Sequence, residues 1–242
     1  RAPGFRRHGP LMLTLVGMNH RSASLELRER ACFAEGDVPA ALSRIKESTS
    51  ATEALILATC NRVEILTRAK DGPSMAAEIR AFLARERGLD DETIERHVYV
   101  HQGLHAVRHV FSVACGLDSM VLGEPQILGQ LKKAYAVAQE SGSTGPVLDR
   151  LLQHALSTAK RVRTVTGISR HAVSVAYAAA NLARTIFDDL TGRSALLLGA
   201  GKMTELAAKH LASQGVTDLT VTNRTYARAE TLADSLGGRA VP

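Results

Sequence analysis

The chain has 242 residues, of which 45% are hydrophobic and 22% are charged, enough apolar material for one large domain or two of ordinary size. These proportions exclude a disordered or fibrous protein, and because no run of about 18 uncharged apolar residues is present, we expect no membrane-spanning helix. Thirty lysines and arginines against 24 aspartates and glutamates give a net charge of +6, which suits a polyanionic partner but is also common among enzymes.

Residues 1–10 contain no apolar stretch and are predicted to be a flexible tail. Residues 11–170 are predicted to form a mixed α/β domain. Strands are expected at 11–16, 54–58, 63–67 and 98–100, with a turn at Gly17–Ser22 after the first, and the early strands form a β-α-β core. Helices are expected at 25–32, from an N-cap at Asp37 to about Ser48, at 75–87, and over most of 105–163 with breaks at 123–125 and 141–146.

A second, smaller domain is predicted beyond residue 170, with the boundary between Gly167 and Ala172. A bridging helix at 172–187 leads to Ala195–Leu198, a continuous apolar run typical of a strand buried on both faces of a parallel sheet. A glycine-rich turn, a helix at 203–214, a strand at 219–221 and a helix at 226–236 follow. The expected fold class is α/β: an α+β N-terminal domain at 11–170 and a Rossmann-type domain at 171–242.

The turn Gly199-Ala200-Gly201-Lys202-Met203-Thr204 is a candidate nucleotide-binding loop. It stands between a strand and a helix, where backbone amides can approach a pyrophosphate, although glycines also end strands for steric reasons alone. About 20 residues further on, where a carboxylate would select NAD, the chain has Asn223-Arg224-Thr225. A guanidinium suits a 2′-phosphate, so NADPH is the predicted cofactor; the alternative is that Arg224 is only an exposed turn charge.

Cys60 is the candidate nucleophile. It directly follows a predicted strand, and a strand end can hold a side chain rigidly while it faces a cleft. Arg62 would favour the thiolate and offers a fork for a substrate carboxylate, whereas the alternative is that Cys60 is a small core residue. Cys115, within the apolar segment 110–117, is expected in the core, and Cys32 looks incidental. Three widely spaced cysteines fit a reducing compartment, so a cytoplasmic protein is expected.

His101, His105 and His109 recur every four residues and would share one face of a helix. Such spacing can bind zinc, but no cysteine or carboxylate nearby completes a ligand set. We therefore predict no metal site and expect histidines on a half-exposed helix face.

Five segments form a distinctive combination: GMNHRSA at 17–23, RER at 28–30, TCNRVE at 59–64, GLDSMVLGEPQILGQ at 116–130 and AKRVRT at 159–164. Together they resemble the glutamyl-tRNA reductase family, and the similarity runs from about Leu13 to the end of the chain. The resemblance implies NADPH-dependent reduction of glutamyl-tRNA(Glu) to glutamate 1-semialdehyde with release of tRNA, the first step of tetrapyrrole (porphyrin, haem) biosynthesis from glutamate.

The resemblance also implies roles for individual residues. Cys60 falls on the nucleophile that forms a glutamyl thioester, and His109 falls on a histidine needed for activity, with proton transfer and pocket shaping both open. The family's NADPH-binding loop falls on Gly199 to Thr204. The substrate-binding positions fall on Thr59, Asn61, Arg62, Ser119, Glu124, Pro125, Gln126 and Gln130.

The partners implied by the resemblance are glutamyl-tRNA(Glu) and glutamate 1-semialdehyde aminomutase. No membrane association is expected. Phosphate contacts are possible at Lys132, Lys133, Lys160, Arg161 and Arg163, although a charge run is usually a solvated helix face.

The chain departs from the family in two ways. Ser24 replaces a proline usual in the family, which affects only the rigidity of a turn. The family is a homodimer whose chain continues beyond the position of Pro242 into a dimerisation domain, so we expect a fragment that forms the thioester without reducing it. The alternatives are a regulatory or partner-binding module of the same fold, and an unrelated NADP-dependent dehydrogenase without a covalent step.

Overall fold

The computed structural model describes residues 12–69, 72–166, 168 and 175–242, and it divides the chain into two compact units, Arg1–His171 (unit 1) and Ala172–Pro242 (unit 2). The predicted tail at 1–10 and the predicted domain boundary at 170/171 lie outside the described residues. None of the helices in these ranges is both long and apolar enough to cross a membrane.

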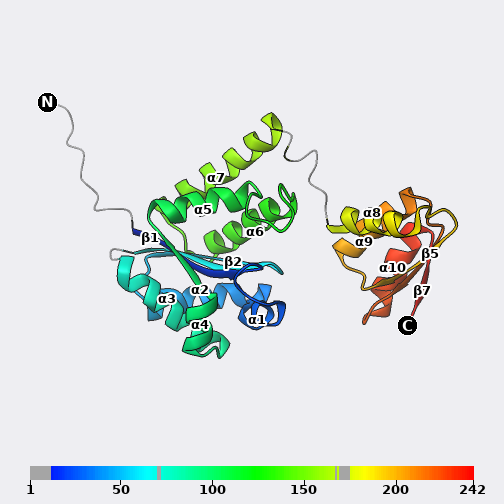
Figure 1. Ribbon diagram of the computed structural model, residues 1–242. Coiled ribbons are helices and arrows are strands. Elements are labelled where there is room, and N and C mark those ends of the chain that lie inside the picture. The colour runs from blue at the N-terminus through cyan, green and yellow to red at the C-terminus, as the bar shows by residue number, and fades with distance from the viewer. Residues whose placement is uncertain (1–11, 70–71, 167, 169–174) are drawn as a thin grey trace. The chain divides into compact units, whose positions relative to one another are not determined.

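Unit 1 is a four-stranded antiparallel sheet between two layers of helices (Figure 1). The strands are β1 (Met12–Asn19), β2 (Glu53–Ala58), β3 (Arg62–Ala69) and β4 (Tyr99–Gln102), in the order β2-β3-β1-β4. One layer of helices is α1 (Leu25–Ala31), the short 3-10 helix η1 (Glu35–Asp37), α2 (Val38–Ser48), α3 (Gly72–Arg87) and α4 (Asp91–His97). The other layer is α5 (Leu104–Ala114), α6 (Gln126–Glu140) and α7 (Pro146–Val165).

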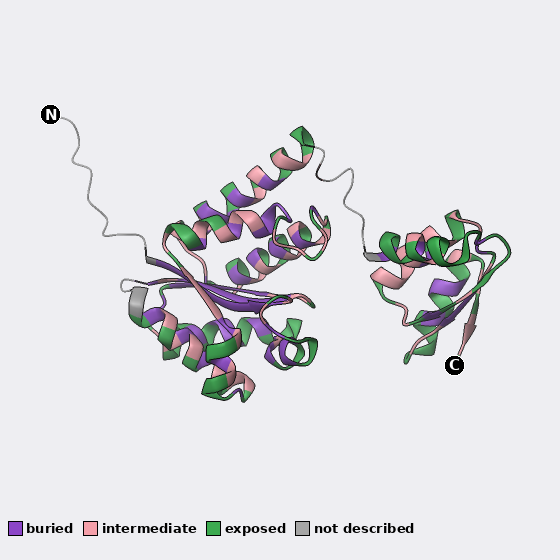
Figure 2. Ribbon diagram, viewed as in Figure 1, coloured by how far each residue is buried: buried purple, intermediate pink, exposed green. Residues whose placement is uncertain are grey.

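Helices cover both faces of the sheet in unit 1, which explains why the sequences of its central strands are continuously apolar. Figure 2 shows the sheet of unit 1 as buried almost throughout, and Leu55, Ile56, Ile65 and Leu66 are each at most 2% exposed. Burial of this size supplies most of the stability of such a layer, at about 25 cal/mol per Å² of apolar surface.

Two predictions about the first sheet are corrected. The expected turn at Gly17–Ser22 begins only at His20, because Gly17, Met18 and Asn19 continue β1 by pairing with Glu64, Val63 and Arg62. The β-α-β interpretation holds only in part, since β3 lies between β1 and β2 and runs antiparallel to both.

Helix predictions in unit 1 are confirmed apart from their ends, one omission and the segment 115–122, which was expected to be helical but forms turns and bends. Asp37 stands at the start of α2 without a side-chain capping bond, α4 was not predicted, and α5 ends at Ala114 so that Cys115 follows it. Cys115 is buried, as expected.

Unit 2 is a parallel three-stranded sheet in the order β5-β6-β7, with β5 (Ser194–Leu198), β6 (Asp218–Thr222) and β7 (Arg239–Val241). Its helices are α8 (Val175–Phe187), α9 (Lys202–Ser213) and α10 (Tyr226–Leu236). The prediction that β5 is buried on both faces is wrong for the described residues. Leu197 is buried, whereas Leu196 and Leu198 are 62% and 75% exposed, because alternate side chains point to opposite faces of the sheet and the face with Leu197 packs against the core of unit 2.

Candidate functional site

Cys60 lies at the tip of the hairpin that joins β2 to β3, and it is exposed. The Thr59 hydroxyl accepts hydrogen bonds from the backbone amides of Asn61 and Arg62, at 3.2 and 3.1 Å, and so closes the turn. Arg28, largely buried, donates through Nε to the carbonyl of Cys60 at 3.2 Å. The thiol is therefore presented by a backbone that its neighbours hold from both sides.

A small pocket surrounds this hairpin tip and brings together side chains from distant parts of the chain. The hairpin supplies one wall, and the segment from the end of α5 to the start of α6 supplies the other. Apart from Ile127, every lining residue is a predicted catalytic or substrate-binding residue: Thr59, Cys60, Asn61, Arg62, Ser119, Glu124 and Gln130.

The remaining predicted residues of unit 1 lie beside this pocket or behind it. Pro125 and Gln126 are the N-cap and the first residue of α6. Arg163 fixes this corner by donating to the carbonyls of Glu124 and Pro125, at 2.8 and 3.3 Å. His109, on α5, does not line the pocket but reaches it through Glu64 and Arg62.

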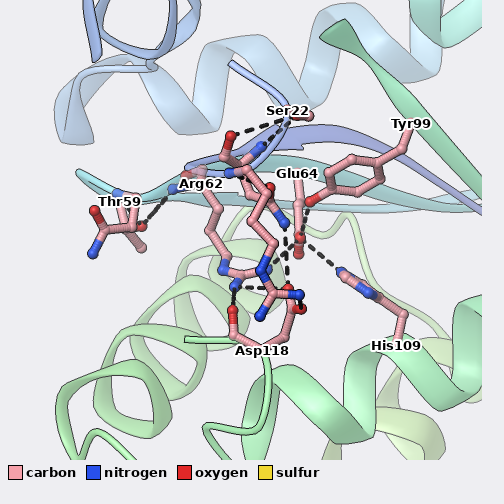
Figure 3. Close-up of polar contacts among 10 residues, drawn as sticks. Ser22, Thr59, Arg62, Glu64, Tyr99, His109 and Asp118 are labelled. Atoms are coloured by element: carbon pink, nitrogen blue, oxygen red, sulfur yellow. Dashed lines mark hydrogen bonds and ion pairs between the residues drawn. The ribbon is translucent and has the colours of Figure 1, made fainter. Parts of the chain in front are cut away.

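A buried ion network extends from Arg62, one of the residues that line the pocket (Figure 3). Arg62, 1% exposed, donates to Glu64 Oε1 at 2.7 Å, and to the carbonyl and Oδ2 of Asp118 at 2.6 and 3.1 Å. Tyr99 Oη donates to the same Glu64 oxygen at 2.5 Å, and His109 Nε2 lies 2.8 Å from it. Three side chains thus converge on one carboxylate.

The network keeps Glu64 ionised. Burial by itself opposes the charge of Glu64, but the hydrogen bond from His109, the charge of Arg62 and the hydrogen bond from Tyr99 outweigh it and lower the pKa of Glu64 to about 2. An ionised carboxylate only accepts, so we assign the proton on His109 to Nε2. Burial and the carboxylate raise the pKa of Tyr99, which keeps the phenol as a donor.

Arg62 lines the pocket, and its guanidinium also has partners within the chain. One terminal nitrogen donates to Glu64 and the other to Asp118. The guanidinium would therefore bind a substrate carboxylate through both nitrogens only by giving up one of these partners. Asp118 in turn accepts from Arg21 at 3.1 Å and from Asn19 at 3.3 Å, which ties the loop after α5 to the end of β1.

Sequence reasoning missed Glu64, Asp118 and Tyr99. Glu64 could have been found, because it stands two residues after Arg62 on one strand and the two side chains share a face. Asp118 and Tyr99 come from other elements, 56 positions from Arg62 and 35 positions from Glu64, and no local pattern connects them.

The histidine prediction is corrected. His101 belongs to β4, and Gly103, at φ +54°, separates it from α5, so only His105 and His109 share a helix. The fold nevertheless stacks the rings of His101 and His109, with their centroids 4.6 Å apart. Burial is the main cause that lowers the pKa of His101, and the charge of His109 lowers it further. Within the described ranges, no cluster of three or more His, Cys, Asp or Glu side chains could hold a metal ion.

Glu124, in the pocket, is another carboxyl with a shifted pKa. Burial raises the pKa of Glu124, and the charge of Arg62 only partly opposes this. The protonated form of Glu124, which can donate a hydrogen bond, is thus favoured more than in an ordinary carboxyl group.

The predicted nucleotide loop lies between β5 and α9. Gly199, at φ +101°, makes the turn, and its amide donates to the carbonyl of Thr222 at 2.7 Å. Gly201 is the N-cap of α9 and provides no side-chain cap, while Lys202, Met203 and Thr204 form the first turn of the helix. A helix that begins this way favours an anion at its N-terminus.

The residues after β6 complete this corner of unit 2. Asn223 Oδ1 accepts from the amide of Ala200 at 3.3 Å, and Asn223 Nδ2 donates to the carbonyl of Thr225 at 2.9 Å. Arg224 is exposed beside them. The uncapped helix start and the exposed guanidinium of Arg224, with no carboxylate directly after β6, make this corner suitable for an anionic group.

Comparisons with known proteins agree with both units. Residues 16–166 match the family described as "Glutamyl-tRNAGlu reductase, N-terminal domain", and residues 181–242 match "Shikimate / quinate 5-dehydrogenase". With the β5-α9-β6 geometry, the second match indicates a nicotinamide-cofactor domain.

Two curated relatives carry the name glutamyl-tRNA reductase. The protein of Syntrophotalea carbinolica is 51% identical over 94% of this chain and 52% of its own length. That of Magnetococcus marinus is 49% identical over 96% of this chain and 55% of its own length.

A solved structure, glutamyl-tRNA reductase from Methanopyrus kandleri, is 38% identical, with a TM-score of 0.63, over 95% of this chain and 53% of that one. The chain spans about half the length of the curated relatives it matches.

Proposed function

This chain belongs to the glutamyl-tRNA reductase family, and from that premise we propose that it transfers the glutamyl group of glutamyl-tRNA(Glu) to Cys60 as the first half of an NADPH-dependent reduction. The observation that supports this most directly is the pocket in which the exposed thiol of Cys60 meets six other predicted site residues. The reduced product would be glutamate 1-semialdehyde, the first intermediate of tetrapyrrole biosynthesis from glutamate.

The proposed covalent step needs an accessible thiol beside a rigid pocket. The thiolate of Cys60 attacks the carbonyl carbon of the glutamyl ester, a carbon–sulfur bond forms, and the bond from that carbon to the ribose oxygen breaks. The ribose hydroxyl leaves with tRNA and takes up the proton that the thiol gave up. The thioester keeps the glutamyl group tethered and more reactive than the ester.

The ion network positions the pocket rather than taking part in the bond changes. Arg62 joins the hairpin of Cys60 to the carbonyl of Asp118, next to Ser119, so the two walls of the pocket keep their separation. His109 supports the same network through Glu64, which favours a role in shaping the pocket over direct proton transfer.

The residues of unit 2 are suited to hold NADPH. Gly199 to Thr204 would receive the pyrophosphate at the start of α9, and Arg224, with Asn223 and Thr225 beside it, would receive the 2′-phosphate. The cofactor supplies a hydride when bound.

The partners in this proposal are glutamyl-tRNA(Glu) and, for the reactive aldehyde product, an aminomutase that consumes it. The free thiols of Cys32, Cys60 and Cys115 fit a reducing compartment, and we place the reaction in the cytoplasm.

The test is to incubate the chain with tRNA carrying labelled glutamate and to measure label that stays on the protein and is released by a competing thiol. We expect one label per chain, mapped to Cys60 by peptide mass spectrometry. A chain that binds the tRNA but takes up no label would instead be a partner-binding module of the same fold.

A further inference from the structure

A second cavity, of about 340 Å³, lies beside the thiol pocket in unit 1. It is bounded by β2, by the connection from α1 to α2, and by α6. Its apolar wall consists of Phe33, Val38, Ile56, Ala58, Ala134 and Val137. A volume of this size is at the lower end of the range for small-molecule sites, roughly 300 to 1,000 Å³.

The cavity adjoins the pocket of Cys60. Gln130 lines both of them, and Ala58, at the end of β2, comes two residues before Cys60. On α6, Gln130 is followed at intervals of three, four and seven residues by Lys133, Ala134 and Val137, so one face of the helix leads from the thiol into the cavity.

The rim of the cavity carries opposite charges. Lys133 Nζ lies 2.5 Å from Glu35 Oε1, and the two side chains are 61% and 74% exposed. An ion pair this exposed contributes little to stability, so Lys133 can exchange it for another anion at small cost. The ammonium of Lys133 is available to a phosphate, and the carboxylate of Glu35 can accept a hydrogen bond from an exocyclic amine.

We propose that this cavity binds the 3′-terminal adenosine of the aminoacylated tRNA, an inference that rests on the proposed function. The glutamyl ester joins the ribose of that nucleoside, so a base seated beside Gln130 brings the ester to Cys60. The apolar wall takes the face of the purine, and Lys133 pairs with the phosphate that precedes the nucleoside. Glu35 accepts from the adenine amine, whereas it would repel the carbonyl oxygen that guanine carries there.

Binding is tested first without chemistry, by calorimetric titration of the 242-residue chain with AMP. We expect one AMP site, and Ala134→Trp, which fills the cavity, should weaken binding about ten-fold or more if a stacked base is lost. Ala136→Trp places the same side chain on the exposed face of α6 and should leave AMP binding unchanged. Equal affinity in the two tryptophan variants, or absence of AMP binding, would overturn the assignment.

Catalysis is tested with two labelled substrates, 2′(3′)-O-glutamyl-adenosine and glutamate ethyl ester. The adenosine ester should label Cys60 at lower concentration than the ethyl ester, and Ala134→Trp should remove that advantage. Lys133→Ala should raise the concentration of glutamyl-tRNA needed for half-maximal labelling more than Lys132→Ala, which removes an equal charge one residue earlier on α6. Equal use of the two esters by the unsubstituted chain would overturn the nucleoside site.

The two proposals fail in different ways. If AMP binds in the cavity but no ester or tRNA labels Cys60, the proposed function is wrong and the nucleoside site stands. If Cys60 is labelled but the cavity variants change nothing, the proposed function stands and the nucleoside site is wrong.

Discussion

Replacing Glu64 by glutamine removes the charge at the centre of the buried network while keeping the size of the side chain. A pKa of about 2 in the folded chain, against an ordinary value near 4.5, corresponds to about 3 kcal/mol of folding free energy at neutral pH. Removal of one partner from a buried ion pair costs a similar amount, about 3 to 5 kcal/mol, because the other charge stays buried. We expect Glu64→Gln to destabilise unit 1 by about 3 kcal/mol.

The pH dependence follows from the direction of the shift. Because the folded pKa of Glu64 is depressed, its stabilisation is fully present above pH 4.5 and is lost as the pH falls toward 2. The difference in stability between the unsubstituted chain and Glu64→Gln should therefore shrink as the pH falls below 4.5.

Hydrogen–deuterium exchange resolved by peptide is the appropriate assay, since it reports on the two units separately. Amides of β3 should exchange faster in Glu64→Gln, while those of β6, in unit 2, serve as an internal reference. Glu92→Gln removes a carboxylate that is 71% exposed in its pair with Arg96, and it should change nothing measurable. Equal protection of β3 in Glu64→Gln and the unsubstituted chain at pH 7 would refute the reasoning.

Three further substitutions test other parts of the molecule. Cys60→Ser should abolish glutamyl labelling while Cys115→Ser keeps most of it, as measured by single-turnover transfer from glutamyl-tRNA; full labelling of Cys60→Ser would remove the covalent step. Arg224→Ala should reduce the preference for NADPH over NADH about ten-fold, as measured by the ratio of the two Kd values. An unchanged ratio would show that Arg224 does not contact the 2′-phosphate. Gly17→Ala should destabilise unit 1 by about 1 to 3 kcal/mol in urea unfolding, because its Cβ would lie 2.6 Å from the carbonyl oxygen of Val63; unchanged stability would contradict the close approach of β1 to β3.

The local organisation of the chain could be predicted from the sequence alone. The strand Ala54–Ala58, the helices around it and the β5-α9-β6 unit follow from hydrophobic periodicity and turn residues, which act over a few positions. The clustering of Cys60 with Ser119 and Gln130 was predicted only because the segments that carry them resemble one family, since nothing local connects residues that far apart.

Only the tertiary structure decided how these elements pair. β3 lies between β1 and β2 and pairs with both of them. This order places Glu64 where Tyr99 and His109 contact it. The strand β5 was expected to be covered on both faces, but its apolar composition does not reveal which neighbours lie against it. Arg62 also neutralises two carboxylates, which its local sequence does not reveal, because a guanidinium that is almost fully buried must satisfy the charges packed around it.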